Sequence, residues 1–164
     1  MMSAQDPRNK FKTSDYDQQE QELPGLQSKM TPQPDCGETS YKGHERLKGY
    51  KMLVTGGDSA IGRAAAIAYA KEGADVAINY LPSEEEDAQE VKQVIEDAGQ
   101  KGILIPGDLR DEQFNYDMVE TAYNELGGLD NVTLVAGHQQ YHDDIHGFNT
   151  EAFAETFETN VYPV

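Results

Sequence analysis

Strand and helix patterns alternate from Lys48 onward, and this alternation restricts the chain to one class of fold. The strand patterns are short apolar runs, at 52–54, 76–78, 103–105 and 132–135. Helical patterns follow them, at 63–72, 84–98, 112–126 and 150–160. Parallel strands need crossover connections of this kind. We therefore expect an α/β fold in which helices cover both faces of a doubly wound parallel sheet of about four strands.

Local signals mark where several of these helices begin and end. Ser83 has Glu86 three residues later, which is the spacing of a capping box. Asp111 stands where a cap for the following helix is needed. Gly73 and Gly99 follow the first two helical patterns, as is typical of a helix C-terminus.

The composition changes near residue 48. Residues 1–47 contain four of the seven prolines, and Leu23, Leu26 and Leu47 are their only bulky aliphatic side chains. Such a segment buries too little apolar surface to offset the entropy lost on ordering. We expect 1–47 to be a flexible, disordered polar tail, ordered only near its end by contact with another surface, and 48–164 to be the folded domain.

The net charge of −17 excludes several function classes. Residues 48–164 contain seven Lys and Arg against 22 Asp and Glu, whereas binding to nucleic acid or to an anionic membrane needs clustered cations. A solvated acidic surface explains this charge, with recognition of a cationic partner as the alternative. The chain has neither a run of the ~18 apolar residues that cross a membrane nor an apolar secretory signal. With Cys36 as the only cysteine, we expect a cytoplasmic protein.

The segment 52–72 carries the most specific functional signal. A strand leads through a Gly-rich turn, Thr55 to Gly62, into an alanine-rich helix. The start of a helix offers unpaired N–H groups and the positive end of the dipole, and glycines let a diphosphate approach. Gly56 is expected to make the tight turn, and Gly62 to let the helix approach the strand. The context favours a Rossmann-type dinucleotide site over an ordinary connection between a strand and a helix.

Several segments resemble motifs of the short-chain dehydrogenase/reductase family. Residues 55–64, TGGDSAIGRA, resemble the family's T-G-x-x-x-G-I-G-R-A signature. Gly107-Asp108-Leu109, Leu126–Asp130 with Ala136-Gly137, and Thr159-Asn160 are similar to later motifs of the family, in the same order. Residues 34–43, PDCGETSYKG, resemble a segment before the domain in bacterial stress-type and glucose/ribitol-dehydrogenase-like members.

This resemblance implies an NAD(P)-dependent oxidoreductase that acts on small-molecule alcohol or carbonyl groups and usually assembles as a homo-oligomer. It implies one residue of the catalytic tetrad, Asn160. The cofactor-binding residues that it implies are Thr55, Gly56, Asp58, Ser59, Ala60, Ile61, Gly62, Asn79, Asp108, Leu109, Ala136 and Gly137.

The family's catalytic Tyr with Lys four residues later is missing, because no Tyr of this chain has Lys at that spacing. The family's catalytic Ser, which also lies beyond the fourth strand, is missing too. We therefore expect a truncated cofactor-binding portion that is inactive alone. The alternative is a non-catalytic nucleotide-binding or interaction module. The family's next strand is also missing, so we expect the unpaired edge of the fourth strand to promote self-association.

Two departures affect the cofactor site itself. Ala60 replaces the middle glycine of the turn, where a methyl group crowds the diphosphate or forces the backbone out of a glycine-only conformation. Leu134-Val135 replaces two asparagines, which removes polar groups that tie the central strands together. For Arg63, contact with a cofactor phosphate and a solvated position on the helix both remain open.

The choice between NAD and NADP rests on the end of the second strand, Asn79-Tyr80. The acids at 84–87 would repel a 2′-phosphate, which slightly favours NAD. A separate histidine run, His138, His142 and His146, has metal-ligand spacing on a helix. Because Gly137 and Gly147 flank this run, we expect loop histidines and no metal site.

Overall fold

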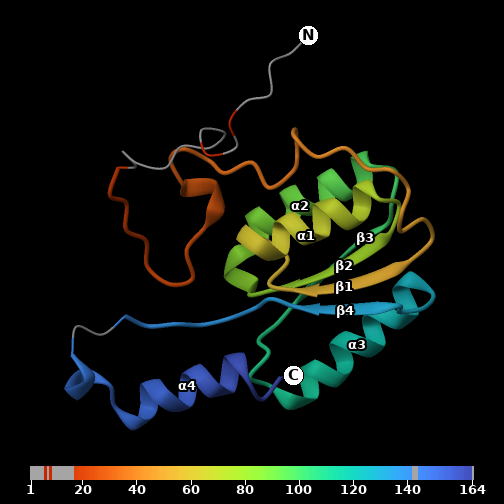
Figure 1. Cartoon of the computed structure of the whole chain (residues 1–164). Coiled ribbons are helices and arrows are strands. Elements are labelled where there is room, and N and C mark those ends of the chain that lie inside the picture. Colours follow the sequence, from red (N-terminus) through yellow and green to blue (C-terminus); the bar gives the residue numbers. More distant parts are fainter. Residues whose placement is uncertain (1–5, 7, 9–16, 142–143, 164) are drawn as a thin grey trace.

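A computed structural model describes residues 6, 8, 17–141 and 144–163. Four parallel strands form one sheet in the order β3-β2-β1-β4 (Figure 1). The strands are β1 (Lys51–Thr55), β2 (Asp75–Tyr80), β3 (Gly102–Pro106) and β4 (Asn131–Leu134), and the helices are α1 (Ala60–Lys71), α2 (Glu85–Asp97), α3 (Glu112–Leu126) and α4 (Thr150–Asn160). The prediction of a doubly wound parallel α/β sheet of four strands is confirmed.

Alternate residues of the strands build two separate cores. Met52 and Val54 of β1 face α1 and α2, where they pack with residues such as Ile67 and Val91. Leu53 faces the opposite side of the sheet and packs with α3. The side chains of a strand point alternately to its two faces, so an unbroken apolar run such as 52–54 serves both layers.

The helix ends match the sequence signals at one place and differ at another. The carboxylate of Asp111 accepts the N–H groups of Gln113 and Phe114, which confirms the predicted cap. The capping box predicted at Ser83 is wrong. Pro82 starts a 3₁₀ turn that contains Ser83, so α2 begins two residues later, and Glu84 is the residue whose carboxylate reaches back to the Leu81 N–H, at 3.1 Å.

The order of the strands defines where a ligand can bind. From β1 the chain moves to β2 and β3 on one side, and then crosses to β4 on the other side. The connections from β1 and β4 therefore leave the sheet in opposite directions, which opens a crevice at the carboxyl ends of these two strands. Beyond this crevice lies α4 (Figure 1). In the described sheet β4 is an edge strand, and Val132 and Leu134 on it are 40% and 49% exposed.

Within the N-terminal segment, the stretch 27–38 lies against α1 and α2 (Figure 1). The Lys71 ammonium donates to the carbonyl groups of Gly37 and Glu38, each at 2.7 Å. The Glu72 carboxylate accepts the guanidinium of Arg46 and the hydroxyl of Tyr41, and these bonds hold the pKa of Glu72 well below its ordinary value. The end of the segment thus contacts the surface of the domain, while the predicted mobility of 1–47 stays a prediction.

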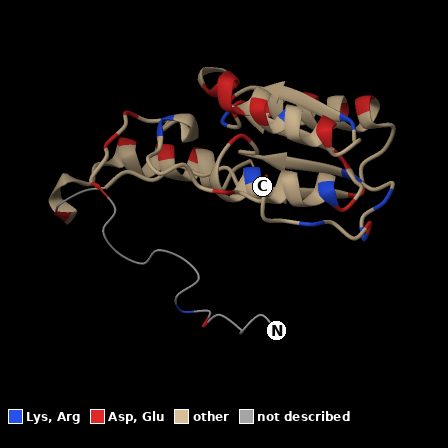
Figure 2. Ribbon diagram, turned by 90° about the horizontal axis from the view of Figure 1, so that it is seen from above, with Lys and Arg blue, Asp and Glu red and all other residues tan. Residues whose placement is uncertain are grey.

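Acidic side chains are spread over the helices (Figure 2). The first turn of α2 alone contains Glu85, Glu86 and Asp87. An acid there interacts favourably with the positive end of the helix dipole, so part of the negative charge stabilises the fold. Within the described residues, no helix combines the length and the hydrophobicity needed to cross a membrane.

Candidate functional site

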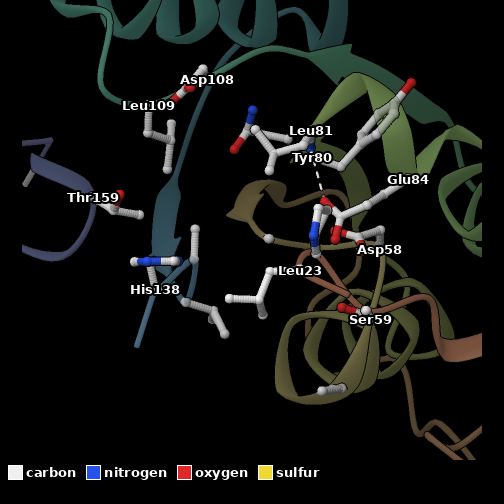
Figure 3. A pocket seen from close by; sticks show the side chains of 18 of the residues that line it. Leu23, Asp58, Ser59, Tyr80, Leu81, Glu84, Asp108, Leu109, His138 and Thr159 are labelled. Carbon is white, nitrogen blue, oxygen red and sulfur yellow. Dashed lines mark hydrogen bonds between the residues drawn. The ribbon is translucent and has the colours of Figure 1, made fainter. Parts of the chain in front are cut away.

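A groove of about 560 Å³ opens at the carboxyl ends of the strands. It lies at the crevice between β1 and β4 that the strand order defines, with walls from the turn after β1, from the end of β2 and from the segments after β3 and β4 (Figure 3). Ten of the twelve residues predicted to bind cofactor line it: Gly56, Asp58, Ser59, Ala60, Ile61, Asn79, Asp108, Leu109, Ala136 and Gly137. The other two, Thr55 and Gly62, lie beneath its floor, where both are buried.

The Gly-rich turn has the close packing that its glycines were expected to allow. Gly56 has a φ of 60°, in the left-handed region that favours glycine. A Cβ atom on Gly62 would lie 1.8 Å from the carbonyl oxygen of Gly56, so a larger residue cannot fit there. The N–H of Gly57 donates to the Asn79 carbonyl at 3.0 Å, which fixes the turn against the end of β2.

The start of α1 carries backbone donors at the edge of the groove, which Ala60 and Ile61 line. The N–H groups of Ala60, Ile61 and Gly62 precede the first intrahelical bond, which Arg63 makes to the Ser59 carbonyl at 2.9 Å. The Ser59 side chain makes no capping bond. The Ala60 N–H donates to the Gln27 side chain at 2.7 Å. The donors of Ile61 and Gly62 therefore have no helical carbonyl to bind, and an anion can take them.

Ala60 keeps the left-handed backbone in spite of its methyl group. Its φ is 46°, a value that costs an L-residue other than glycine about 1 kcal/mol. The replacement of the middle glycine was expected either to crowd the diphosphate or to force the backbone out of a glycine-only conformation. The backbone does not leave that conformation. Ala60 is instead strained, and it lines the groove.

Thr55 ties the glycine-rich turn to the segment after β4. Its hydroxyl oxygen accepts the N–H of Val135 at 3.0 Å and that of Ala136 at 3.2 Å. Thr55 is 1% exposed, so these bonds are shielded from water. The Thr55 hydroxyl thus links the central strands at the place where Leu134-Val135 replaces the family's asparagines.

Asn79 and Asp108 form the wall at the ends of β2 and β3. The side-chain amide of Asn79 donates to the carbonyls of Ile105 and Gly107, at 3.2 and 3.1 Å. The carboxylate of Asp108 pairs with the Arg110 guanidinium, which holds the pKa of Asp108 below its ordinary value. Asn79 therefore holds the ends of β2 and β3 together. The charge of Asp108, at the edge of the groove, is balanced by Arg110.

Two buried carboxyl groups lie on the wall beside the turn. Asp58 is 2% exposed, and its Oδ2 atom has no hydrogen-bond partner among the described residues. Glu84 is 9% exposed, and burial together with the charge of Asp58 raises the pKa of Glu84 to about 7. Burial likewise raises the pKa of Asp58. Both groups line the groove, where they offer acceptors to hydroxyl or amino groups of a ligand (Figure 3).

The four acids at 84–87 have different positions. Of these, Glu84 lines the groove. Glu85 accepts the hydroxyl of Tyr80 at 2.5 Å, and Asp87 is fully buried, where it accepts two backbone N–H groups of the N-terminal segment. Of this segment, only Glu84 can therefore repel a 2′-phosphate in the groove, with Asp58 beside it.

His138 and Thr159 line the opposite wall (Figure 3). The Asn160 side chain bonds both backbone groups of His138, accepting its N–H at 2.7 Å and donating to its carbonyl at 2.8 Å. Asn160, predicted as a member of the catalytic tetrad, thus holds α4 against the segment after β4. The Nε2 atom of His138 is buried and has no partner among the described residues.

His146 is the other histidine of the run that the structure describes. His146 is exposed and pairs with Asp144 at 2.8 Å, whereas His142 and Asp143 lie outside the described residues. The ranges 17–141 and 144–163 contain no group of three or more His, Cys, Asp or Glu side chains that could hold a metal ion.

Arg63 occupies neither of the positions considered for it. It is 7% exposed and pairs with Glu38 at 2.7 Å and with Glu90 at 3.1 Å, away from the groove. The sequence offered no sign of this, because Glu38 lies in a segment whose docking on α1 has no local pattern. The sequence likewise offered no sign that Leu23, Pro24 and Gly25 of the N-terminal segment line the groove.

His138 also lines the groove, and the sequence could have indicated it, since it directly follows Ala136-Gly137.

The architecture and the turn define a nucleotide-binding domain of the Rossmann type. Comparison with known proteins narrows the class. A family model described as short chain dehydrogenase matches residues 51–164. The chain is 57% identical over 162 residues to the uncharacterized oxidoreductase YghA of Escherichia coli, covering 99% of this chain and 55% of that protein. General stress protein 39 of Bacillus subtilis is 48% identical over 139 residues, which are 85% of this chain and 48% of that protein.

Solved structures that resemble this chain are also short-chain dehydrogenases. A short chain dehydrogenase from Burkholderia cenocepacia, in complex with NADP, has a TM-score of 0.66 and 37% identity, over 72% of this chain and 47% of that one. The chain belongs to the short-chain dehydrogenase/reductase family. It spans about half the length of the curated relatives that it matches.

Proposed function

We propose that this chain is the cofactor-binding portion of an NAD(P)-dependent oxidoreductase that acts on alcohol and carbonyl groups. The observation that carries this proposal is the start of α1, where the N–H groups of Ile61 and Gly62 have no helical carbonyl to bind, at a glycine turn that opens onto the groove. A dinucleotide brings a diphosphate that such donors bind. Relatives described as oxidoreductases and a structural neighbour in complex with NADP support the assignment.

The residues present fit a dinucleotide along the groove. The turn at 59–62 would hold the diphosphate, and the segment at Asp108 and Leu109 would contact the adenine. Ala136 and Gly137, on the β4 side, would border the nicotinamide. When bound, the cofactor supplies or accepts the hydride, while the protein positions it.

The orphaned carboxyl oxygen of Asp58 supports NAD over NADP. Asp58 and Glu84 offer acceptors that match the ribose hydroxyl groups. Above pH 7, where Glu84 is ionised, a 2′-phosphate beside these two groups would meet like charge at a poorly solvated position, where repulsion is strong. The cation that lines the groove in the described structure, Arg110, is paired with Asp108.

Turnover needs groups that this chain does not supply. The family's Ser and Tyr-x-x-x-Lys have no counterpart in the sequence, and Asn160 alone has no hydroxyl or amine with which to move a proton to the substrate. We therefore propose that the chain binds cofactor without reducing or oxidising a substrate by itself. A binding module that serves another chain is the second candidate, which the same groove supports.

Calorimetric titration of the 164-residue chain with NAD, NADP, ADP-ribose and adenosine tests the proposal. We expect saturable binding of NAD and ADP-ribose, weaker binding of NADP, and none of adenosine, which lacks the diphosphate. An assay with NADH and small aldehydes run in parallel is expected to show no oxidation of NADH. If none of the dinucleotides binds to a folded sample, the proposed function is wrong.

A further inference from the structure

Residues 19–31, here called the arm, form a closed loop. The side-chain amide of Gln19 exchanges two hydrogen bonds with the backbone of Thr31, both at 2.8 Å. Gln21 does the same with Leu26, at 2.9 and 3.0 Å. Each glutamine side chain thus bonds a backbone N–H and a backbone C=O, as a neighbouring strand would. These bonds give the loop a defined shape, although it contains little regular secondary structure.

The arm is anchored on α2. The Asp87 carboxylate accepts the backbone N–H of Gln27 at 2.6 Å and that of Ser28 at 3.1 Å. Asp87 is fully buried and Gln27 is 5% exposed, so water does not compete for these bonds. If the arm detached, the buried Asp87 carboxylate would lose both donors, and an unsatisfied buried carboxylate is costly. This cost makes the anchor strong.

The anchor leads directly to the glycine-rich turn. The Oε1 atom of Gln27 accepts the Ala60 N–H at 2.7 Å, and Ala60 is the strained residue at the start of α1. Gln27 takes the first of the three donors there and leaves those of Ile61 and Gly62. The arm therefore stabilises the turn without occupying the whole anion site.

The tip of the arm reaches into the groove. Leu23, Pro24 and Gly25 line it together with Asp58 and Glu84. The Leu23 side chain is 65% exposed and lies at the groove beside the turn (Figure 3). An apolar side chain fixed in this place leaves its surface open to whatever fills the groove, and burying that surface is favourable.

We propose that the arm is a built-in wall of the cofactor pocket, in which Leu23 packs against the bound nicotinamide dinucleotide and the contacts of Gln27 with Asp87 and Ala60 hold that wall in place. This inference rests on the proposed function, because the ligand is the same dinucleotide. It adds a binding determinant from outside the α/β domain. The arm then differs from a plug, which would compete with the dinucleotide for the groove.

The test compares two substitutions within the arm of the 164-residue chain. Leu23→Ser removes the apolar contact at an exposed position, so the fold is retained. Met30→Ser is the matched control, because Met30 is also an exposed apolar side chain of the arm, at 40%, but is not among the residues that line the groove. Calorimetric titration with NAD is expected to show a Kd about fivefold higher for Leu23→Ser, and an unchanged Kd for Met30→Ser.

Each result decides a separate point. Equal affinity of Leu23→Ser and the wild-type chain overturns the wall and leaves the proposed function intact. Tighter binding by Leu23→Ser shows that the arm competes with the dinucleotide, which also overturns the wall. If the wild-type chain binds no dinucleotide, the proposed function fails, and the wall fails with it.

Discussion

The hydroxyl oxygen of Thr55 accepts the backbone N–H of Ala136 at 3.2 Å, together with that of neighbouring Val135. This contact joins the last residue of β1 to the segment that leaves β4, across the crevice where the groove opens. One buried side chain therefore links two of the segments that wall the groove. Its removal is the simplest test of how the site is held together.

Thr55→Val should lower the free energy of unfolding by about 2 kcal/mol, since two partly buried N–H groups lose a buried acceptor while the volume is kept. Thr55→Ser keeps the oxygen and loses only a methyl group, so its cost should be smaller. Urea unfolding followed by circular dichroism measures both. If the valine variant is as stable as the serine variant, the bonds of the Thr55 hydroxyl do not contribute to the stability of the fold.

Ala60→Gly should stabilise the chain by about 1 kcal/mol, because glycine adopts a φ of 46° without strain. It should also tighten the binding of NAD, since the methyl group leaves the floor of the groove. Ala65→Gly is the control, because Ala65 lies inside α1 and glycine there should destabilise by about 1 kcal/mol. Thermal unfolding of both variants checks the opposite signs, and a loss of stability in Ala60→Gly would contradict the backbone assignment.

Glu84→Gln should stabilise the chain at pH 8 more than at pH 5. The pKa of Glu84 is raised from 4.5 to about 7, so between these values the folded state binds the proton and the unfolded state does not. The stability that Glu84 contributes is therefore present below pH 4.5 and is lost as the pH rises through 7. The neutral amide keeps an acceptor for the Leu81 N–H and avoids the buried charge.

The expected gain of the variant over the wild-type chain is larger at pH 8 than at pH 5 by about 1–2 kcal/mol. Urea titrations at the two pH values measure it. Because the comparison is made at each pH, the opposite contribution of Glu72, whose pKa is lowered, cancels. A difference that does not change with pH would mean that the carboxyl of Glu84 is charged in the folded state throughout this range.

The exposed edge of β4 should make the chain self-associate. Unpaired backbone groups of an edge strand pair readily with another chain, and Val132 and Leu134 add exposed apolar surface. The double substitution Val132→Lys and Leu134→Lys should reduce association in sedimentation velocity. Tyr116→Lys, at an exposed position of α3, should not change it. A wild-type chain that sediments as a monomer at high concentration would rule out this role of the edge.

The fold could be predicted because its signals are local. The apolar run at 52–54 predicts a buried strand, and β1 extends only one residue beyond it at each end. The helix expected at 150–160 has the same bounds in the structure. At Ser83 a local pattern was misleading, because Pro82 places that residue inside a 3₁₀ turn, and α2 begins only at Glu85.

The site could be predicted only where one continuous motif builds it. The turn from Thr55 to Gly62 is such a motif, and its residues line or support the groove. The contact of Gln27 with Ala60 joins residues 33 positions apart, and the pair of Arg63 with Glu38 joins residues 25 apart. Neither pair belongs to a periodic pattern. Long-range polar contacts of this kind follow from packing, which the sequence does not display.

The most direct test of the central claim, that the start of α1 binds a dinucleotide diphosphate, is a titration of the ¹⁵N-labelled chain with NAD, followed by amide chemical shifts. We expect the resonances of Ile61 and Gly62 to move most, in a saturable way. ADP-ribose should reproduce the shifts, and adenosine should not. A well-dispersed spectrum in which these two resonances stay fixed, up to NAD concentrations in the millimolar range, would contradict it.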